Sequence, residues 1–137
     1  MKKKRFYELI KLFKILRGPN GCLWDRKQNF NTLLKYLREE TGEYIEAAKK
    51  RNYHEMKDEL GDILLNVIFN AQIASESGKF DIDDVIENLI NKLKRRHPHV
   101  FGKTRVKSVN DILVNWNKIK KLEKKILTTN KHRYTQC

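Results

Sequence analysis

Two short stretches of the chain each carry a pair of carboxylates at a spacing that suits metal binding. Glu40 and Glu43 stand three residues apart in one stretch, and Glu59 and Asp62 stand three apart in the other. On a helix this spacing turns both members of a pair toward one side. Either stretch alone is also typical of a solvated helix face. The two together favour a site that binds a cation.

Four carboxylates that lie close together repel one another and raise each other's pKa values, so a protein tolerates them only with cations among them. Oxygen ligands of this kind suit Mg²⁺, with Mn²⁺ as a substitute. A di-iron bundle would instead use Glu-x-x-His motifs, and the sequence contains none. Gly42 and Gly61, which each cost about 1 kcal/mol inside a helix, suggest close helix packing or a nearby ligand.

A group of cations near residue 95 suits phosphate. Some of these charges are explained by the favourable interaction of cations with the C-terminus of a helix. The planar fork of arginine also matches phosphate oxygens, which a substrate with three phosphates would supply. We expect the neighbouring His97 and His99 to have a structural or phosphate-binding role. The cations are Lys92, Lys94, Arg95 and Arg96.

The two tryptophans are candidates for contact with a nucleobase. Either Trp24 or Trp116 could stack on a nucleobase, because every base presents a π face. Trp116 also fits a helix core, because Ile112, Leu113 and Ile119 share its helical side.

The apolar residues predict the helices that position these groups. They recur at the helical period over about residues 6–16, 31–51 and 54–77, then from Asp81 to Pro98, and in a shorter helix after Ser108. Gly78 is expected to stop the third helix, residues 22–28 to form an ordered loop, and no segment predicts a strand. We therefore expect an all-α bundle of four to five helices. Residues 1–127 form a single domain in this interpretation, and residues 128–137 a disordered polar tail.

The four carboxylates meet if the second and third helices pack antiparallel. Taking Leu37 and Leu60 as the centres of the two apolar stripes, the paired acids lie on the same rotational side of each stripe. Fifteen residues separate Glu43 from Glu59, which is enough for one helix to end and the next to begin.

The distribution of charge separates two classes of function. The chain has 137 residues and a formal net charge of +13, which alone would suggest a nucleic-acid-binding module. Residues 1–36 carry ten basic and two acidic side chains, residues 37–91 six and thirteen, and residues 92–137 fourteen and two. An acidic centre with basic flanks instead points to a metal and a nucleotide. No apolar run could cross a bilayer, and two unpaired cysteines predict a cytoplasmic protein.

The motifs together resemble the MazG nucleoside triphosphate pyrophosphohydrolases of the all-α NTP pyrophosphatase superfamily, from about Ile10 to Lys125. The long Arg-Arg-His-Pro-His-Val-Phe string is the most specific of them. The usual proline of the family's Cys-Pro-Trp-Asp string is Leu23 in this chain, in a loop that bears on base selectivity. The residues that carry the resemblance are Leu16-Arg17, Cys22, Trp24-Asp25, Gln28, Glu39-Glu40-x-x-Glu43, Glu59-Leu-Gly-Asp62, Lys92-Leu-x-Arg-Arg-His-Pro-His-Val-Phe-Gly102, Trp116 and Ile119-Lys120.

The resemblance implies Mg²⁺-dependent hydrolysis of nucleoside triphosphates between the α and β phosphates, which gives a nucleoside monophosphate and pyrophosphate. It implies a homodimer whose subunits complete one another's bundles. The lack of a long apolar run and the distribution of charge lead us to expect no membrane partner and no nucleic acid partner. The implied metal ligands are Glu40, Glu43, Glu59 and Asp62, and the implied substrate-binding residues are Lys92, Arg95, Arg96 and Trp116.

Glu39 is not needed for the carboxylate pairs and is a candidate catalytic base or an orienting residue. Asn66, one turn beyond Asp62, is expected to assist Glu39. Two alternatives to this function stay open. One is a related all-α pyrophosphohydrolase for dUTP or phosphoribosyl-ATP, and the other is a basic helical module that binds RNA or DNA.

Overall fold

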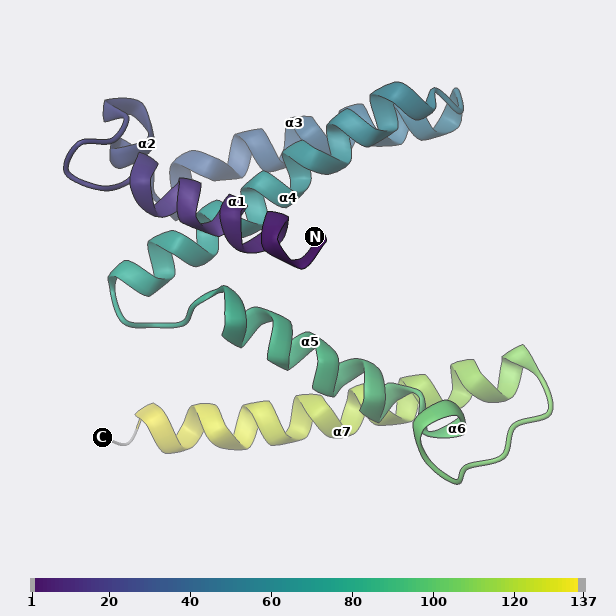
Figure 1. The fold of residues 1–137 in the computed structure, drawn as a ribbon. Helices are drawn as coiled ribbons and strands as arrows, with labels where there is room; N and C mark the ends of the chain where they lie inside the picture. The colour runs from purple at the N-terminus through teal and green to yellow at the C-terminus, as the bar shows by residue number, and fades with distance from the viewer. Residues whose placement is uncertain (1, 136–137) are drawn as a thin grey trace. The chain divides into compact units, whose positions relative to one another are not determined.

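The protein is all-α, as the sequence predicts. A computed structural model describes the backbone of residues 2–135 and the side chains of residues 4–127. Within these residues there is no strand, and no helix is both long and apolar enough to pass through a lipid bilayer. The helices are α1 (Lys2–Leu16), α2 (Leu23–Lys27), α3 (Phe30–Lys49), α4 (Tyr53–Glu76), α5 (Ile82–Arg96), α6 (Pro98–Phe101) and α7 (Val109–Thr135), shown in Figure 1.

Short side chains at the helix ends explain where the helices begin and stop. The Asn29 side chain accepts a hydrogen bond from the Thr32 amide at 3.0 Å, and the Asn29 amide donates to Thr32 Oγ1 at 2.8 Å. Asp81 and Asp84 exchange the same pair of bonds at the start of α5. These reciprocal bonds satisfy amides that have no partner inside the helix. Gly78, with φ of +67°, follows α4 in the left-handed conformation that glycine adopts readily.

Three segments differ from the sequence predictions. The expected loop at residues 22–28 contains the single-turn helix α2, and α6 follows His97 with Pro98 at its first position. Such short helices have no apolar period by which they could be recognised. Helix α7 is longer than predicted, since its backbone continues to Thr135 through most of the expected tail. The side chains of residues 128–137 lie outside the described part of the chain, and the domain boundary at residue 127 stays a prediction.

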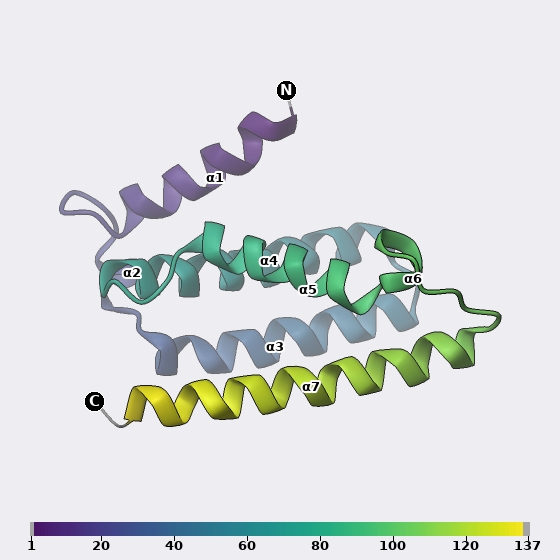
Figure 2. The same cartoon turned by 90° about the horizontal axis from the view of Figure 1, so that it is seen from below.

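The helices group into two units, residues 1–85 and residues 86–137, and each is described by itself. In the first unit α3 and α4 form an antiparallel pair, and α1 packs against α4. The pairing of α3 with α4 is also visible in Figure 2. In the second unit, ion pairs join the end of α5 to α7.

The core of the first unit lies where α1, α3 and α4 meet. Phe13, Leu33, Ile68 and Phe69 are buried there in one cluster. The rings of Phe13 and Phe69 meet edge to face with their centroids 5.4 Å apart, an arrangement that aromatic pairs prefer. Helix α4 therefore supplies half of the buried cluster.

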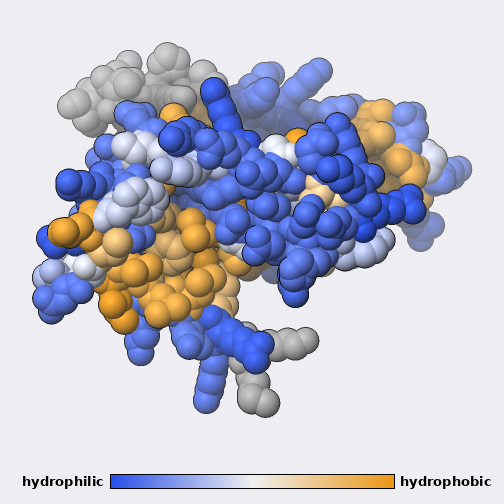
Figure 3. Space-filling view, turned by 90° about the horizontal axis from the view of Figure 1, so that it is seen from above, coloured by the Kyte–Doolittle hydropathy of each residue, from blue (hydrophilic) through white to orange (hydrophobic). Residues whose placement is uncertain are grey.

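The apolar stripes predicted for α3 and α4 were centred on the wrong residues. Leu37 and Leu60, the expected centres, are 38% and 49% exposed. The chain buries Leu33 on α3 and Phe69 on α4 instead. Because both helices carry apolar residues on more than one face, the period alone does not select the buried face. Figure 3 shows apolar surface, in orange, gathered in patches beside a broad hydrophilic surface.

Candidate active site

The antiparallel packing of α3 and α4 brings the four predicted metal ligands together. Partial burial raises the pKa values of Glu40, Glu59 and Asp62, and the charge of Glu43 raises all three further. Asp62 also raises the pKa of Glu40 across the helix pair. The predicted carboxylates therefore interact across the helix pair, with Glu43 acting on the other three.

Glu59 is the most strongly perturbed member of the cluster. Partial burial, a hydrogen bond with Glu43 and the charges of Glu43, Asp62 and Asp58 raise its pKa to about 7. Its Oε2 atom is enclosed and has no hydrogen-bond partner among the described residues. A carboxylate oxygen in this position is free to bind a cation.

Asp58 is an acidic neighbour that the sequence reasoning missed. One carboxylate oxygen from each of Asp58, Glu59 and Asp62 lies within 4.8 Å of the other two. The signal was present, since Asp58 stands four residues before Asp62 and so shares its side of the helix. The acidic cluster is therefore larger than the two pairs alone.

Asn66 assists a different carboxylate from the one predicted. Its Nδ2 atom donates a hydrogen bond to Glu40 Oε2 at 2.6 Å, and no such bond to Glu39 is found among the described residues. Burial raises the pKa of Glu40, and this hydrogen bond opposes that rise because it favours the charged form. The Asn66 side chain is 1% exposed, and its Oδ1 atom has no partner in the described structure.

Glu39 is exposed and lines an open groove of about 660 Å³ together with Glu43 and Glu59. The charge of Glu39 also raises the pKa of Glu40, although by less than burial and the charges of Asp62 and Glu43 do. Gly42 lies in the same groove, and a Cβ atom there would meet no described atom within 4 Å. The same holds at Gly61, so close helix packing does not explain either glycine within the described residues.

The donor set of the cluster fits a hard divalent cation. All of its side-chain ligand atoms are carboxylate oxygens, which Mg²⁺ and Mn²⁺ prefer. None of the ion pairs identified among the described side chains of residues 4–127 includes any of the four predicted ligands. Together with the unpartnered Glu59 oxygen, this leaves the cluster with negative charge that a bound cation would offset.

The predicted phosphate-binding arginines meet a glutamate in the second unit. Arg95 Nε lies 2.7 Å from Glu123 Oε1, and Arg96 Nη2 lies 2.8 Å from Glu123 Oε2. The hydrogen bond from Arg96 lowers the pKa of Glu123, partial burial opposes this, and Arg95 lowers it further. Arg95, Arg96 and Glu123 line a groove of about 810 Å³ between α5 and α7, and Lys92 lines it as well. Glu123 could not be found from a local pattern, because it lies 27 residues beyond Arg96.

Trp116 is half-buried and lies among the same cations. The Arg96 guanidinium is 5.6 Å from the centre of its ring, and the Lys120 ammonium is 5.9 Å away. The ring of His97 meets it edge to face at 4.9 Å, while His97 Nδ1 lies 2.6 Å from the Leu93 carbonyl oxygen. The carboxylates belong to the first unit and these residues to the second, and the roles of these residues in binding phosphate and nucleotide stay predictions.

Comparison with known proteins supports one family. The family profile described as "MazG nucleotide pyrophosphohydrolase domain" matches residues 28–101. The chain is 57% identical over 97 residues to the nucleoside triphosphate pyrophosphohydrolase/pyrophosphatase MazG of Thermotoga maritima, covering 71% of this chain and 38% of that protein. It is 40% identical over 117 residues to the nucleoside triphosphate pyrophosphohydrolase of Escherichia coli K12, covering 85% and 44%.

An uncharacterized Bacillus subtilis protein, YabN, is 49% identical over 113 residues, covering 82% of this chain and 23% of that protein. The chain thus spans less than half the length of these three relatives. A crystal structure of a MazG-related protein from Thermotoga maritima superposes with a TM-score of 0.68 at 29% identity, covering 86% of this chain and 98% of that one. The chain belongs to the MazG nucleotide pyrophosphohydrolase family.

Proposed function

We propose that this protein is a Mg²⁺-dependent pyrophosphohydrolase that cleaves nucleoside and deoxynucleoside triphosphates between the α and β phosphates. The observation that carries this proposal is the cluster of carboxylates from α3 and α4, in which an enclosed oxygen of Glu59 has no described partner. The names of the relatives support the same class of reaction.

Glu40, Glu43, Glu59 and Asp62 would hold Mg²⁺, with Mn²⁺ as a substitute. When bound, the cation supplies positive charge to phosphate oxygens and makes a nearby water more acidic. Asn66 keeps the Glu40 carboxylate in place through its amide hydrogen bond. Residues that orient a metal ligand in this way commonly contribute to metal affinity.

Glu39 is the proposed base. Its carboxylate is exposed in the acidic groove, where it accepts a proton from the attacking water. The water oxygen forms a bond to the α phosphorus, and the bond from that phosphorus to the oxygen bridging to the β phosphate breaks. Pyrophosphate leaves on the opposite side, and the nucleoside monophosphate remains.

Lys92, Arg95 and Arg96 are proposed to contact the phosphates. Glu123 holds both guanidinium groups in place at α7, which lowers the entropy they lose when they bind phosphate oxygens. Trp116 approaches the nucleotide beside them.

We also infer a homodimer. The exposed leucines of α3 and α4 form apolar surface that the described chain leaves uncovered, and such surface marks interaction sites. They are Leu34, Leu37, Leu60 and Leu64. Sedimentation velocity should give a dimer for the wild type and a monomer for Leu64→Asp, while Leu12→Asp on α1 stays dimeric. A wild-type monomer would contradict this inference. The cytoplasmic location stays a prediction.

The function is tested with a panel of NTPs and dNTPs, assayed for pyrophosphate and orthophosphate with and without Mg²⁺. We expect pyrophosphate and nucleoside monophosphate in equal amounts, and only with the cation. Glu59→Gln and Asp62→Asn should each lower turnover at least a hundredfold without unfolding the protein. Glu8→Gln, which removes an exposed carboxylate from α1, is the matched control. Unchanged turnover in both cluster variants would refute the assignment.

The same panel separates the alternatives. Selective cleavage of dUTP, or of phosphoribosyl-ATP added to the panel, would assign the protein to a related pyrophosphohydrolase activity. A nucleic-acid-binding module would release no pyrophosphate and would bind long polynucleotides without metal, with an affinity that falls steeply as salt is raised.

A further inference from the structure

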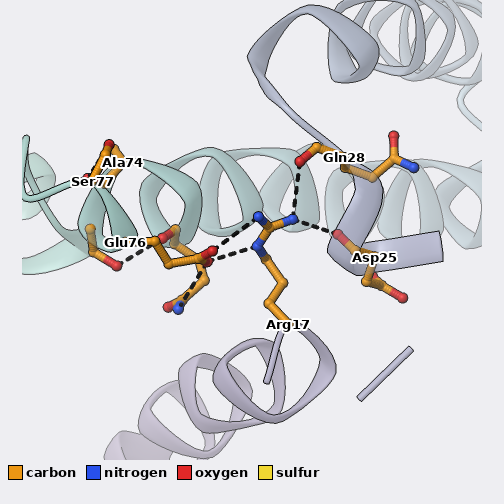
Figure 4. A network of polar contacts seen from close by, with 8 residues as sticks. Arg17, Asp25, Gln28, Ala74, Glu76 and Ser77 are labelled. Carbon is orange, nitrogen blue, oxygen red and sulfur yellow. Dashed lines mark hydrogen bonds and ion pairs between the residues drawn. The ribbon is translucent and has the colours of Figure 1, made fainter. Parts of the chain in front are cut away.

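Arg17, which follows the last residue of α1, connects two parts of the first unit. Its Nε and Nη2 atoms donate to the two carboxylate oxygens of Glu76 on α4, at 2.7 and 3.0 Å. Its Nη1 atom donates to the carbonyl oxygens of Asp25 and of Gln28, the latter at 3.1 Å (Figure 4). The Arg17 side chain is only 9% exposed, and its guanidinium lies 5.6 Å from the centre of the Phe69 ring. One side chain thus ties α2 and the residue after it to α4.

Helix α2 depends on such outside contacts for its position. It has five residues, none of them buried, and no side-chain cap at its first turn. A helix this short is not stable by itself in water. The two carbonyl oxygens that Arg17 binds lie in and just after α2, so this fork of hydrogen bonds fixes the segment.

The segment that Arg17 holds forms one wall of a cavity of about 220 Å³. Trp24 of α2 lies edge to face with Tyr36 of α3 and Phe69 of α4, at centroid distances of 5.7 and 6.5 Å. All three rings line the cavity, together with Glu40 and Asn66. The cavity therefore lies directly beside a proposed metal ligand.

The chemistry of this cavity suits a flat aromatic group that donates hydrogen bonds. Its walls are largely aromatic and aliphatic, and aromatic side chains stack on nucleobases. The buried Asn66 Oδ1 atom has no described partner, while the amide nitrogen of the same side chain is taken by Glu40. The volume is below the roughly 300–1,000 Å³ of pockets that enclose a whole drug-sized ligand, so it fits part of a nucleotide.

We propose that Arg17 is a positioning residue, which holds α2 against α4 so that the cavity beside Glu40 is formed to take the base of the nucleotide. This inference rests on the proposed function, because it assigns the base of that substrate to a place. Arg17 itself touches neither the base nor the reacting phosphate.

The test measures binding of two kinds of probe by isothermal titration calorimetry with Mg²⁺ present. The four ribonucleoside monophosphates carry a base, and inorganic tripolyphosphate does not. Arg17→Met should weaken binding of the monophosphates that the wild type binds by about tenfold, the scale of one base stack, and change the tripolyphosphate affinity less than twofold. Arg17→Lys should give a smaller loss, because one ammonium cannot reproduce the fork.

Two further variants keep the test decisive if Arg17→Met does not fold. Trp24→Ala removes a half-exposed wall of the cavity and should show the same selective loss. Arg26→Met removes a charge from α2 that binds only the Pro19 carbonyl oxygen among the described residues, and it should leave both affinities unchanged. A merely structural role for Arg17 would lower the melting temperature and leave both affinities of the folded protein intact.

The results separate this inference from the proposed function. The inference is overturned if Arg17 variants bind monophosphates as tightly as the wild type does, or if their affinities for both probes fall equally. It is also overturned if the wild type binds no monophosphate. Pyrophosphate release by the wild type together with such a result would leave the function standing. Selective loss of monophosphate binding in a protein that releases no pyrophosphate would support the cavity assignment and refute the function.

Discussion

The raised pKa of Glu59 predicts that protons and divalent cations compete for the carboxylate cluster near neutral pH. Partial burial and the neighbouring acids raise the pKa of this group to about 7 in the protein without metal. A carboxylate must be ionised to bind a cation, so the cation has to displace a proton below that pH. The affinity for Mg²⁺ or Mn²⁺ should therefore increase with pH.

The size of the effect follows from the pKa. At pH 6 about nine in ten Glu59 side chains carry a proton, and at pH 8 about one in ten does. If binding needs the ionised form, the apparent dissociation constant should be about tenfold larger at pH 6 than at pH 8. About half a proton should be released for each cation bound at pH 7.

Isothermal titration calorimetry at pH 6, 7 and 8 measures both quantities, when each titration is repeated in two buffers of different ionisation enthalpy. Glu59→Gln should bind the cation more weakly and lose most of the pH dependence between pH 6 and 8. Glu8→Gln should behave as the wild type does. A dissociation constant that changes less than twofold between pH 6 and 8 in the wild type would refute the reasoning.

Three further predictions concern stability. Without divalent cations, the free energy of unfolding should fall as pH rises from about 5 to 7, because the folded state then binds a proton on Glu59 that the unfolded chain, with an ordinary pKa of 4.5, releases. Urea titrations across this range measure the fall in the free energy of unfolding, and Mg²⁺ added at pH 8 should restore part of the lost stability. A free energy of unfolding that rises from pH 5 to pH 7 would contradict the prediction. The pKa of Glu123 is lowered, so its contribution to the free energy of unfolding is present above pH 4.5 and is lost as the pH falls below that value. Between pH 5 and pH 3, Glu123→Gln should therefore lose less of its melting temperature than the wild type does. An equal loss would count against the ion pairs of Glu123. Phe69→Ala should lower the free energy of unfolding, measured by urea titration, by about 3–5 kcal/mol, because Phe69 is buried. Tyr53→Ala, at an exposed position, should change it by less than about 0.5 kcal/mol. Similar values for the two variants would show that Phe69 is not central to the core.

The starts of α3, α4, α5 and α7 were the part of the fold that the sequence predicted best. The helix starts predicted at Asp81 and Ser108 coincide with capping hydrogen bonds, and the predicted stop at Gly78 coincides with a left-handed glycine. These signals are local, because a cap involves residues within one turn of each other. The single turn of α2 carries no such signal and was predicted as a loop.

The candidate site was predicted in part. Two carboxylate pairs on neighbouring antiparallel helices were enough to predict the cluster around Glu43, and their helical spacing is local information. The partner of Asn66 was predicted wrongly as Glu39, because the choice between adjacent glutamates depends on how α3 and α4 are rotated against each other. The ligand roles themselves stay proposals.

The sequence by itself determined that the chain is helical, where α3, α4, α5 and α7 begin, and which side of each helix carries the acids, because these properties depend on residues three or four apart. Only the tertiary structure decided that α4 buries Phe69 and leaves Leu60 exposed, and that Arg17 reaches Glu76, 59 residues away. Such contacts depend on which of several apolar faces packs best when distant segments meet, and burial of a face is a property of the assembled helices rather than of any one of them.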